Sequence, residues 1–211
     1  MKKILIVANG PRVEQRIMRQ AVSECQLVVA ADGGIAACRR AGIEPDYLVG
    51  DMDSVTSDML LSQYTKKIYN PDQETTDMQK VLNFTRGLTA DEIIVINAFG
   101  GRADHTFANY LILEEFSREF KLQVFDNIGR LSFLKPGRTV LVDQVGKIAS
   151  LWAFSGVEDL NLNGFKYELK DKNAATEFLG ISNEILKDKA TIEFNKGKLA
   201  LYLHWEGKNV S

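Results

Sequence analysis

Three acidic residues that follow short apolar runs constrain this chain most strongly. The run Leu27–Ala30 leads into the sequence ADGG, in which Asp32 precedes two glycines. The run Tyr47–Val49 leads into GDMDS, which contains Asp51 and Asp53. Short continuous apolar runs are typical of strands buried on both faces of a parallel sheet, so the three carboxylates are predicted to lie where such strands end.

Carboxylates at neighbouring strand ends are suited to one hard cation. Mg²⁺ takes oxygen ligands in near-octahedral geometry and commonly shares them with substrate phosphates, so Asp32, Asp51 and Asp53 are candidate metal ligands. Gly33, directly after Asp32, allows a tight turn and a close approach of a ligand to the backbone. The alternative interpretation is that these residues only turn the chain and cap the following helices.

The first part of the chain alternates strand-like and helix-like segments. Strands are expected at 4–8, 27–31, 47–49, 68–69, 92–97 and 122–125, and helices at 13–22, 35–41, 57–61, 76–85 and 103–120. This alternation predicts a Rossmann-like α/β domain, with parallel strands joined by right-handed crossovers and helices on both faces of the sheet. Ligands bind such sheets outside the carboxyl ends of the strands, where the acidic residues are placed.

The pattern changes after about Asp126. Short β-branched or aromatic segments separated by turn signals occupy 130–134, 138–142, 147–152, 157–161, 190–194 and 198–205, and only 173–178 has a faint helical pattern. These segments predict a small antiparallel β-sandwich. The chain is therefore expected to form two domains, 1–126 and 127–211.

Composition and charge exclude several classes of function. The 211 residues carry a formal net charge of −2 and no basic cluster, which argues against nucleic acid or an anionic membrane as a partner. No apolar run is long enough to span a membrane. The apolar stretch after Lys2 and Lys3 stops at Asn9, which makes it a first strand rather than a signal peptide, and a cytoplasmic protein is expected. Cys25 and Cys38 form no metal-binding or disulfide pattern.

The sequence NPDQETTDMQK is a second acidic cluster. It places Thr76 as the N-cap of a helix, Asp77 in the first turn, and Lys80 one turn later on the same side. An acid in a first helical turn is also favoured by the helix dipole without any function. Asp77 is nevertheless a candidate ligand, because Asp72, Glu74 and Asp77 repel one another unless a cation is near.

The sequence GGRADHT follows the expected strand 92–97 and opens the long helix. Glycines before a helix N-terminus make an anion site, and the fork of Arg102 suits a phosphate. Together with the acidic residues, this segment predicts a polyphosphate held by Arg102 and backbone amides, with Mg²⁺ between phosphates and carboxylates. No Walker A sequence is present, so a nucleotide would be bound in another way.

The ordered set of motifs resembles the thiamine pyrophosphokinase family. ADGG, PDYLVGDMDS, QETTD with a following lysine, and GGRADHT match four motifs of that family in order and spacing, and GISNE matches its late G-x-S-N signature. The resemblance runs from about residue 4 to residue 205. It implies ATP-dependent transfer of a pyrophosphoryl group to the hydroxyethyl oxygen of thiamine, giving thiamine diphosphate and AMP. It also implies a homodimer whose sites are completed by the partner chain.

The resemblance also assigns roles to the two domains and to single residues. It implies ATP and metal binding by 1–126, and thiamine binding and dimerisation by 127–211. The implied metal and phosphate site consists of Asp32, Asp51, Asp53 and Asp77, and the implied nucleotide contacts are Gln73, Thr76, Arg102 and Asp104, with Gly33 allowing close approach. Ser182 and Asn183 match the thiamine signature. Catalysis is expected from Asp51, Asp53, Asp77 and Arg102, with Asp77 or Asp104 accepting the hydroxyl proton.

One position departs from the family. Animal and fungal members stack a tryptophan of the last strand on thiamine, whereas the matching position here falls near Leu201. Period-2 alternation puts Tyr202 and His204 on the face opposite Leu201, and Trp205 on the same face. The side chains that hold the thiamine rings are therefore not assigned by the resemblance.

Two alternative functions stay open at the level of sequence. A pyrophosphokinase for a pterin alcohol would use the same metal and phosphate residues, although GISNE and the small β domain favour thiamine. A non-catalytic sensor of thiamine diphosphate or of a nucleotide would be favoured by the loss of Asp51, Asp53 or Asp77. All three are present, which favours an enzyme.

Overall fold

The computed structural model describes residues 1–53, 63–177 and 179–207. The chain divides into two compact units, Met1–Asn127 and Ile128–Ser211. The helix expected at 57–61 lies outside the described residues. None of the described helices is both long and apolar enough to cross a membrane.

The first unit alternates strands and helices along the chain. Its elements are β1 (Lys3–Val7), α1 (Gln15–Glu24), β2 (Leu27–Ala31), the 3₁₀ turn η1 (Asp32–Gly34), α2 (Ile35–Arg40), β3 (Tyr47–Gly50), β4 (Lys66–Tyr69), α3 (Asp77–Arg86), β5 (Glu92–Ile96), α4 (Ala103–Phe116) and β6 (Lys121–Phe125).

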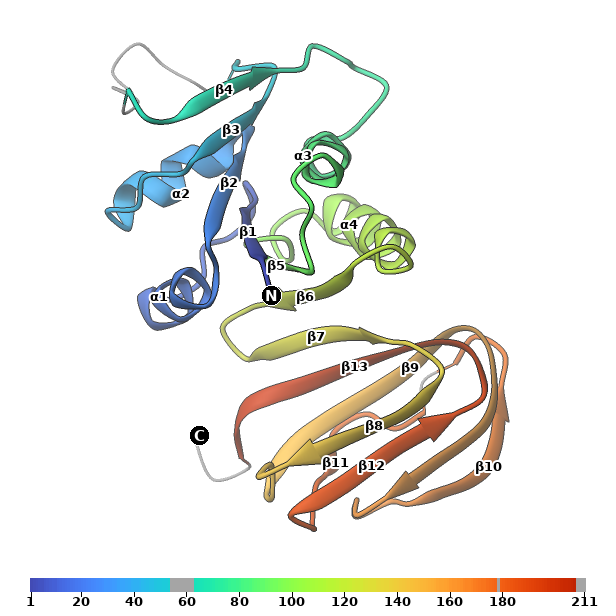
Figure 1. Ribbon diagram of the computed structural model, residues 1–211. Coiled ribbons are helices and arrows are strands. Elements are labelled where there is room, and N and C mark those ends of the chain that lie inside the picture. The colour runs from blue at the N-terminus through green and yellow to red at the C-terminus, as the bar shows by residue number, and fades with distance from the viewer. Residues whose placement is uncertain (54–62, 178, 208–211) are drawn as a thin grey trace. The chain divides into compact units, whose positions relative to one another are not determined.

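The described strands of the first unit form a parallel sheet in the order β4-β3-β2-β1-β5-β6. Helices α1 and α2 lie on one face of this sheet, and α3 and α4 lie on the other (Figure 1). The predicted Rossmann-like α/β architecture is therefore confirmed. Because the chain leaves the sheet at β4 and returns beside β1 as β5, the strand order reverses between β1 and β5, which is where such sheets bind ligands.

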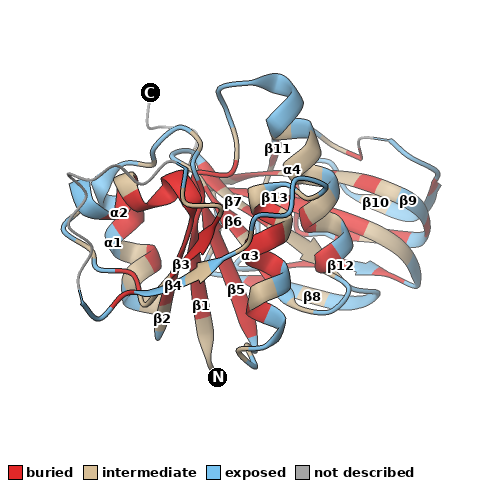
Figure 2. Ribbon diagram, turned by 90° about the horizontal axis from the view of Figure 1, so that it is seen from above, coloured by how far each residue is buried: buried red, intermediate tan, exposed pale blue. Residues whose placement is uncertain are grey.

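The central strands β1 and β5 explain why the apolar runs show no alternation. Residues Ile4–Val7 and Glu92–Ile96 are buried on both faces, between the helices that flank the sheet (Figure 2). The charged exception is Glu92, whose carboxylate lies 3.0 Å from Lys121 Nζ and 3.5 Å from Lys3 Nζ. A buried carboxylate needs such partners, so this end of the sheet is held by an ion-pair cluster.

The two glycines of ADGG are required by packing against β1. A Cβ on Gly34 would lie 2.0 Å from the carbonyl oxygen of Val7, and a Cβ on Gly33 would lie 2.3 Å from Asn9 Nδ2. Within η1 it is Asp32, and neither glycine, that takes a left-handed φ, of +33°. The glycines therefore permit the close approach of two chain segments, which is a reason different from the tight turn expected from the sequence.

We expect Gly34→Ala to lower the free energy of unfolding by about 3 kcal/mol, the upper part of the range for overpacking, because the Val7 carbonyl is held in β1. Gly87→Ala is the matched control, since a Cβ there would meet Phe84 O at an ordinary 3.5 Å. Urea unfolding followed by circular dichroism measures both variants. Equal stability of Gly34→Ala and the wild type would disprove the close approach of η1 to β1.

Two helices have ends other than those expected, for local reasons. Helix α1 begins at Gln15 rather than 13, because Glu14 has a non-helical ψ of 154°. The amides of Val13 and Glu14 donate to the side chains of Asn97 and Asn127, at 2.9 and 2.6 Å. Helix α4 ends at Phe116 rather than 120. Just beyond it the Ser117 hydroxyl donates to the carbonyl of Glu114 at 2.6 Å, a local bond that competes with continued helix.

The second unit is built of antiparallel strands. Its elements are β7 (Gly129–Leu134), β8 (Gly137–Val142), β9 (Lys147–Asn163), β10 (Leu169–Ala174), β11 (Asn183–Glu184), β12 (Lys189–Phe194) and β13 (Lys196–Gly207). Their order is β7-β13-β9-β12-β8, with β10 and β11 also pairing with β9, and every one of these pairings is antiparallel. The predicted antiparallel class is confirmed.

The long strand β9 corrects the expectation of two strands at 147–152 and 157–161. Its first part pairs with β13 and β11, and its last part pairs with β10 and β12. This one strand therefore contributes to both layers of the unit, the layer that contains β7, β13 and β11 and the layer that contains β10, β12 and β8. Gly156, which lies between the two expected strands, is inside β9. A Cβ on Gly197 of β13 would lie 2.3 Å from its carbonyl oxygen, so glycine here marks close strand packing.

The faint helical pattern at 173–178 is wrong where the structure describes it. Asn173 and Ala174 end strand β10, and the described residues that follow, 175–177, are not helical. Ala174 pairs with Val157 of β9, so tertiary pairing has overridden a weak local preference.

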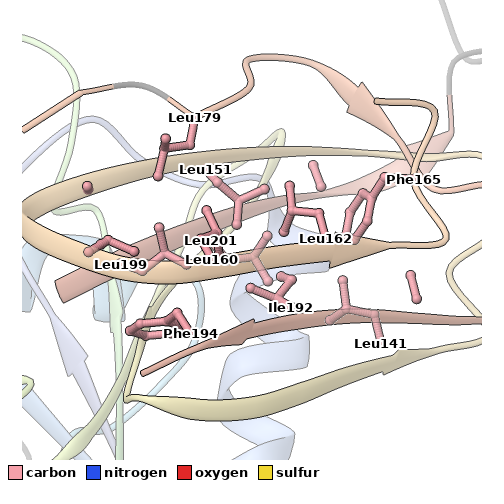
Figure 3. Packing of buried hydrophobic residues seen from close by; sticks show 14 of the residues in the cluster. Leu141, Leu151, Leu160, Leu162, Phe165, Leu179, Ile192, Phe194, Leu199 and Leu201 are labelled. Carbon is pink, nitrogen blue, oxygen red and sulfur yellow. The ribbon is translucent and has the colours of Figure 1, made fainter. Parts of the chain in front are cut away.

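The core of the second unit lies between its two layers. Strand β13 places Leu199, Leu201 and Leu203 inward, while Tyr202 and His204 are half-buried, which confirms the predicted period-2 alternation. Figure 3 shows Leu199 and Leu201 in the same interior as residues of the other strands. Those other core residues include Leu141, Leu151, Leu160, Leu162, Phe165, Leu179, Ile185, Ile192 and Phe194.

Candidate active site

A cavity of about 890 Å³ lies at the carboxyl ends of the parallel strands in the first unit. Its walls come from residues 8–11 after β1, Asp51 after β3, the segment from Gln73 to Lys80 at the start of α3, residues 97–98 after β5, and the start of α4. The cavity therefore lies at the reversal of strand order between β1 and β5, as expected for a ligand site in this fold.

Lys80 lines this cavity, and its charged side chain is buried. Its side chain is 2% exposed, and its Nζ lies 3.5 Å from Asp51 Oδ2 and 3.8 Å from Asp77 Oδ1. Gln73 Nε2 also donates to Asp51 Oδ2, at 3.5 Å. The prediction that Lys80 lies on the same side of the helix as Asp77 is confirmed, and the helix places its ammonium between two carboxylates.

Thr76 begins helix α3 as the N-cap, as the sequence predicts. Its Oγ1 accepts from the amide of Gln79 at 3.2 Å, and Gln79 Oε1 accepts from the amide of Thr76 at 3.0 Å, which completes a capping box. This fixed start holds Asp77 at the cavity wall. Thr76 lines the cavity too, and its role in nucleotide binding stays a prediction.

The remaining predicted acids lie beside the cavity rather than on its wall. Asp32 is 4% exposed, and its Oδ1 has no hydrogen-bond partner among the described residues. It packs against Gly50, where a Cβ would lie 2.7 Å from Asp32 Cβ. Asp53 is exposed, and its amide donates to Asp51 Oδ1 at 3.3 Å. Gly33 is buried beside Asn9 and is also not part of the wall.

The acids differ in how their surroundings affect ionisation. Burial and the nearby negative charge of Asp32 raise the pKa of Asp77, and Lys80 only partly opposes them. The pKa of Asp51 is lowered by the amide of Asp53 and by the charge of Lys80. The carboxylates of Asp32, Asp51 and Asp77 thus form one electrostatic group that Lys80 does not fully neutralise.

This group fits an added cation but is not a preassembled metal site. Within residues 1–53, 63–177 and 179–207, no three His, Cys, Asp or Glu side chains are gathered as metal ligands. Lys80 lies between Asp51 and Asp77, which keeps these two carboxylates apart. The buried Asp32 Oδ1, which has no partner among the described residues, is the kind of oxygen that a hard divalent cation binds. The predicted ligand set Asp32, Asp51, Asp53 and Asp77 stays a prediction.

The sequence GGR forms the opposite wall. Gly100 and Gly101 have φ of +92° and +71°, and a Cβ on Gly100 would lie 3.2 Å from the ring of Pro11. Helix α4 begins after Arg102 without a side-chain cap from that residue, and within its first turn the amide of His105 donates to Asp104 Oδ1 at 3.0 Å. Arg102 forms a two-bond fork with Asp104 at 3.1 and 2.5 Å, and this pair holds the pKa of Asp104 at about 2.

Three asparagines that line the cavity were not predicted from the sequence. Asn97 directly follows β5 and Asn9 comes two residues after the end of β1, so the strand-end rule that indicated the acids also applies to them. Asn97 has φ of +57°, its Oδ1 accepts from Val13 N at 2.9 Å, and its buried Nδ2 has no partner among the described residues. Asn109, on α4, donates to the carbonyl of Ala98 at 2.7 Å, which no local pattern indicates.

The second unit contains the late signature GISNE. Ser182 is exposed with a left-handed φ of +58°, and its amide donates to Ser150 Oγ at 2.9 Å. Asn183 is 1% exposed, and its side chain is bonded to the backbone of Tyr167. Ser182 is thus exposed and Asn183 is buried, and the assignment of both residues to thiamine binding stays a prediction.

Comparison with known proteins agrees with both units. Residues 18–125 match the family described as "Thiamin pyrophosphokinase, catalytic domain", and residues 139–199 match "Thiamin pyrophosphokinase, vitamin B1 binding domain". The chain is 29% identical to the thiamine pyrophosphokinase of Bacillus subtilis (strain 168) over 209 residues, which cover 95% of this chain and 98% of that protein.

Solved structures show the same fold. The crystal structure of thiamine pyrophosphokinase from Bacillus subtilis aligns with a TM-score of 0.82 at 26% identity, over 96% of this chain and 99% of that one. Thiamin pyrophosphokinase from Candida albicans aligns with a TM-score of 0.82 at 18% identity, over 97% and 89%. Since the family match covers both the cavity and the late signature, the chain belongs to the thiamin pyrophosphokinase family.

Proposed function

We propose that this protein transfers the pyrophosphoryl group of ATP to the hydroxyethyl oxygen of thiamine, giving thiamine diphosphate and AMP. Membership of the family, in both its catalytic and its vitamin B1 binding parts, supports this activity. The observation that carries it is the cavity that gathers Asp51, Asp77, Lys80 and Arg102 at the strand-order reversal. Neither a pterin alcohol as substrate nor a non-catalytic sensor is favoured by these findings.

ATP is proposed to bind with its phosphates at the start of α4. The positive end of the α4 helix dipole and the Arg102 guanidinium supply positive charge there, and Arg102 would exchange Asp104 for a phosphate. Gln73 and Thr76 line the facing wall. Because the transferred group contains the β and γ phosphates, the β-phosphorus is the atom that this cavity must present to the alcohol.

Mg²⁺ is proposed as the cofactor. Asp51, together with Asp32 and Asp53 beside it, would hold the ion near the phosphates of ATP. When bound, Mg²⁺ would neutralise phosphate charge that otherwise repels the attacking oxygen. Lys80 contributes fixed positive charge to the same wall and holds Asp51 and Asp77 in place.

Two observations support Asp77 rather than Asp104 as the acceptor of the hydroxyl proton. The Asp104 carboxylate is paired with Arg102, which holds its pKa at about 2 and makes it a weak base. Burial and Asp32 raise the pKa of Asp77, which makes it a stronger base. A carboxylate bound directly to the metal loses this basicity, so we assign Asp77 to the proton and Asp51 to the ion.

The second unit is proposed to bind thiamine through Ser182, and the protein is proposed to act as a homodimer, as the family resemblance implies. A cytoplasmic location is part of the proposal, because both cysteines are free thiols and ATP is the co-substrate. Sedimentation velocity of the purified protein tests the dimer.

The activity is tested by incubating the protein with ATP, Mg²⁺ and thiamine and separating the products by chromatography. Equal amounts of AMP and thiamine diphosphate are expected. Production of ADP, or no product at all, would overturn the proposal. Replacing thiamine by a hydroxymethyl pterin in the same assay tests the alternative substrate, and no AMP is expected from it.

A further inference from the structure

The side chain of Asn183 in the late signature hydrogen-bonds twice to one other residue, Tyr167. Its Oδ1 accepts from the amide of Tyr167 at 3.0 Å, and its Nδ2 donates to the carbonyl of Tyr167 at 2.8 Å. Asn183 is 1% exposed, so its surface is covered by the protein while its amide holds Tyr167. A side-chain amide that satisfies both backbone groups of a single residue fixes the position of that residue.

The segment that carries Tyr167 is anchored along the signature by further contacts. Phe165 forms an antiparallel bridge with Ile185, and both side chains are buried, at 3% and 0% exposed. The amide of Lys166 donates to the carbonyl of Glu184 at 2.8 Å. The backbone of Tyr167 is therefore held against Asn183, which directly follows Ser182. Tyr167 itself remains 65% exposed.

The ring of Tyr167 is an exposed aromatic surface carried on a backbone that Asn183 holds in place. Among the large hydrophobic side chains that the structure describes as exposed in the second unit, Tyr167 is the aromatic one. Its ring already attracts a cation, since Lys166 Nζ lies 5.8 Å from its centroid. An exposed tyrosine face binds flat, positively charged heteroaromatic rings by stacking and by cation–π attraction.

We propose that Tyr167 binds the heteroaromatic rings of thiamine, and that Asn183 is a positioning residue that acts through Tyr167. This proposal rests on the proposed function. The positively charged thiazolium of thiamine is the class of ring that a tyrosine face favours. Ser182, exposed beside it with its amide held by Ser150, would contact a polar group of the same ligand.

The first test compares Tyr167→Leu, Tyr167→Phe and the control Tyr64→Leu in the assay of AMP formation. Tyr64 is a similarly exposed tyrosine, 76% exposed, which lies two residues before β4 in the first unit. Tyr167→Leu is expected to raise the KM for thiamine about tenfold and to leave the KM for ATP within about twofold. Tyr167→Phe keeps the ring and is expected to stay close to the wild type.

A thiamine KM for Tyr167→Leu equal to that of the wild type would overturn the proposal, as would an equal rise in Tyr64→Leu. This failure is distinct from a failure of the proposed function, in which the wild type itself forms no thiamine diphosphate. Equal rises in the KM for thiamine and for ATP would also count against a thiamine contact.

The positioning role is tested by a double-mutant cycle. Asn183→Ala is expected to raise the KM for thiamine as Tyr167→Leu does, because the freed backbone no longer fixes the ring. If Asn183 acts through Tyr167, the double variant has a thiamine KM no higher than that of Tyr167→Leu alone. If the fold-increases in thiamine KM of the two single variants multiply in the double variant, the positioning role of Asn183 is contradicted. If Asn183→Ala does not fold, Tyr167→Leu decides the proposal.

Discussion

Replacing Asp77 with asparagine is expected to lower kcat about 10³-fold while the protein stays folded. The carboxylate lies on the cavity wall, 3.8 Å from Lys80, and is the proposed proton acceptor. Asparagine keeps the size and the helix position but cannot accept a proton, and loss of such a group costs about 10² to 10⁴ in rate. The measurement is kcat from AMP formation at saturating ATP and thiamine.

The stability of Asp77→Asn is expected to differ little from that of the wild type, because two effects of the substitution oppose each other. Removing a charge from the first turn of α3 loses a helix-dipole interaction of about 0.3–1 kcal/mol. It also removes the repulsion from Asp32 and Asp51 that contributes to the raised pKa of Asp77. The melting temperature is therefore expected to stay within about 4 °C of the wild type.

Asp143→Asn is the matched control for this variant. Asp143 is an exposed aspartate of the second unit with φ of +57°, a conformation that asparagine adopts readily. Its rate is expected to equal that of the wild type. If Asp77→Asn retains more than about a tenth of the wild-type kcat, Asp77 does not carry the proton and another base must be sought.

Sequence patterns predicted those structural features that depend on residues close together in the chain. The N-cap at Thr76 and the placement of Lys80 beside Asp77 follow from helix geometry over a few residues, and both are found. The apolar runs located the strands of the parallel sheet, because burial on both faces leaves a clear signal. The strand-end rule then placed Asp51 correctly at the cavity.

Contacts between distant segments could not be predicted in this way. The burial of Lys80 depends on how α3 packs across β2 and β3, and the sequence shows only its charge. The glycines of ADGG are needed because Val7 of β1 and Asn9, two residues after it, approach them closely. The continuous strand β9 arises because its two halves pair with different strands, β13 and β12, which are distant in sequence.

The contact of Asn183 with a distant segment of the chain was likewise not predictable from its sequence motif. The signature assigns it to thiamine, but its side chain bonds the backbone of Tyr167, sixteen positions earlier in the chain. A motif marks that a residue is needed without telling whether it contacts the ligand or holds another residue in place. The three-dimensional contacts separate these two roles.

Replacing Lys80 with methionine is expected to lower kcat/KM for ATP about 10²-fold with a stability change within about 1 kcal/mol. Lys80 is 2% exposed, so its charge is held in the interior at a desolvation cost. Its partners Asp51 and Asp77 are 20% and 45% exposed, and water can solvate them when the ammonium is removed. Methionine fills the volume, and the lost function is the positive charge beside the phosphates.

Removing the acidic partners of Lys80, instead of Lys80 itself, separates the role of its charge from the role of its packing. Removing both carboxylates, in Asp51→Ala with Asp77→Ala, leaves the buried ammonium of Lys80 without these ion-pair partners, and a loss of about 3–5 kcal/mol is expected in urea unfolding. Lys67→Met, at an exposed position of β4, is the control and is expected to change neither rate nor stability. If Lys80→Met destabilises the protein more than the double aspartate variant does, the lysine is a structural anchor of α3. If Lys80→Met loses activity and keeps its stability while the aspartate variant loses stability, the charge of Lys80 acts on the reaction rather than anchoring α3.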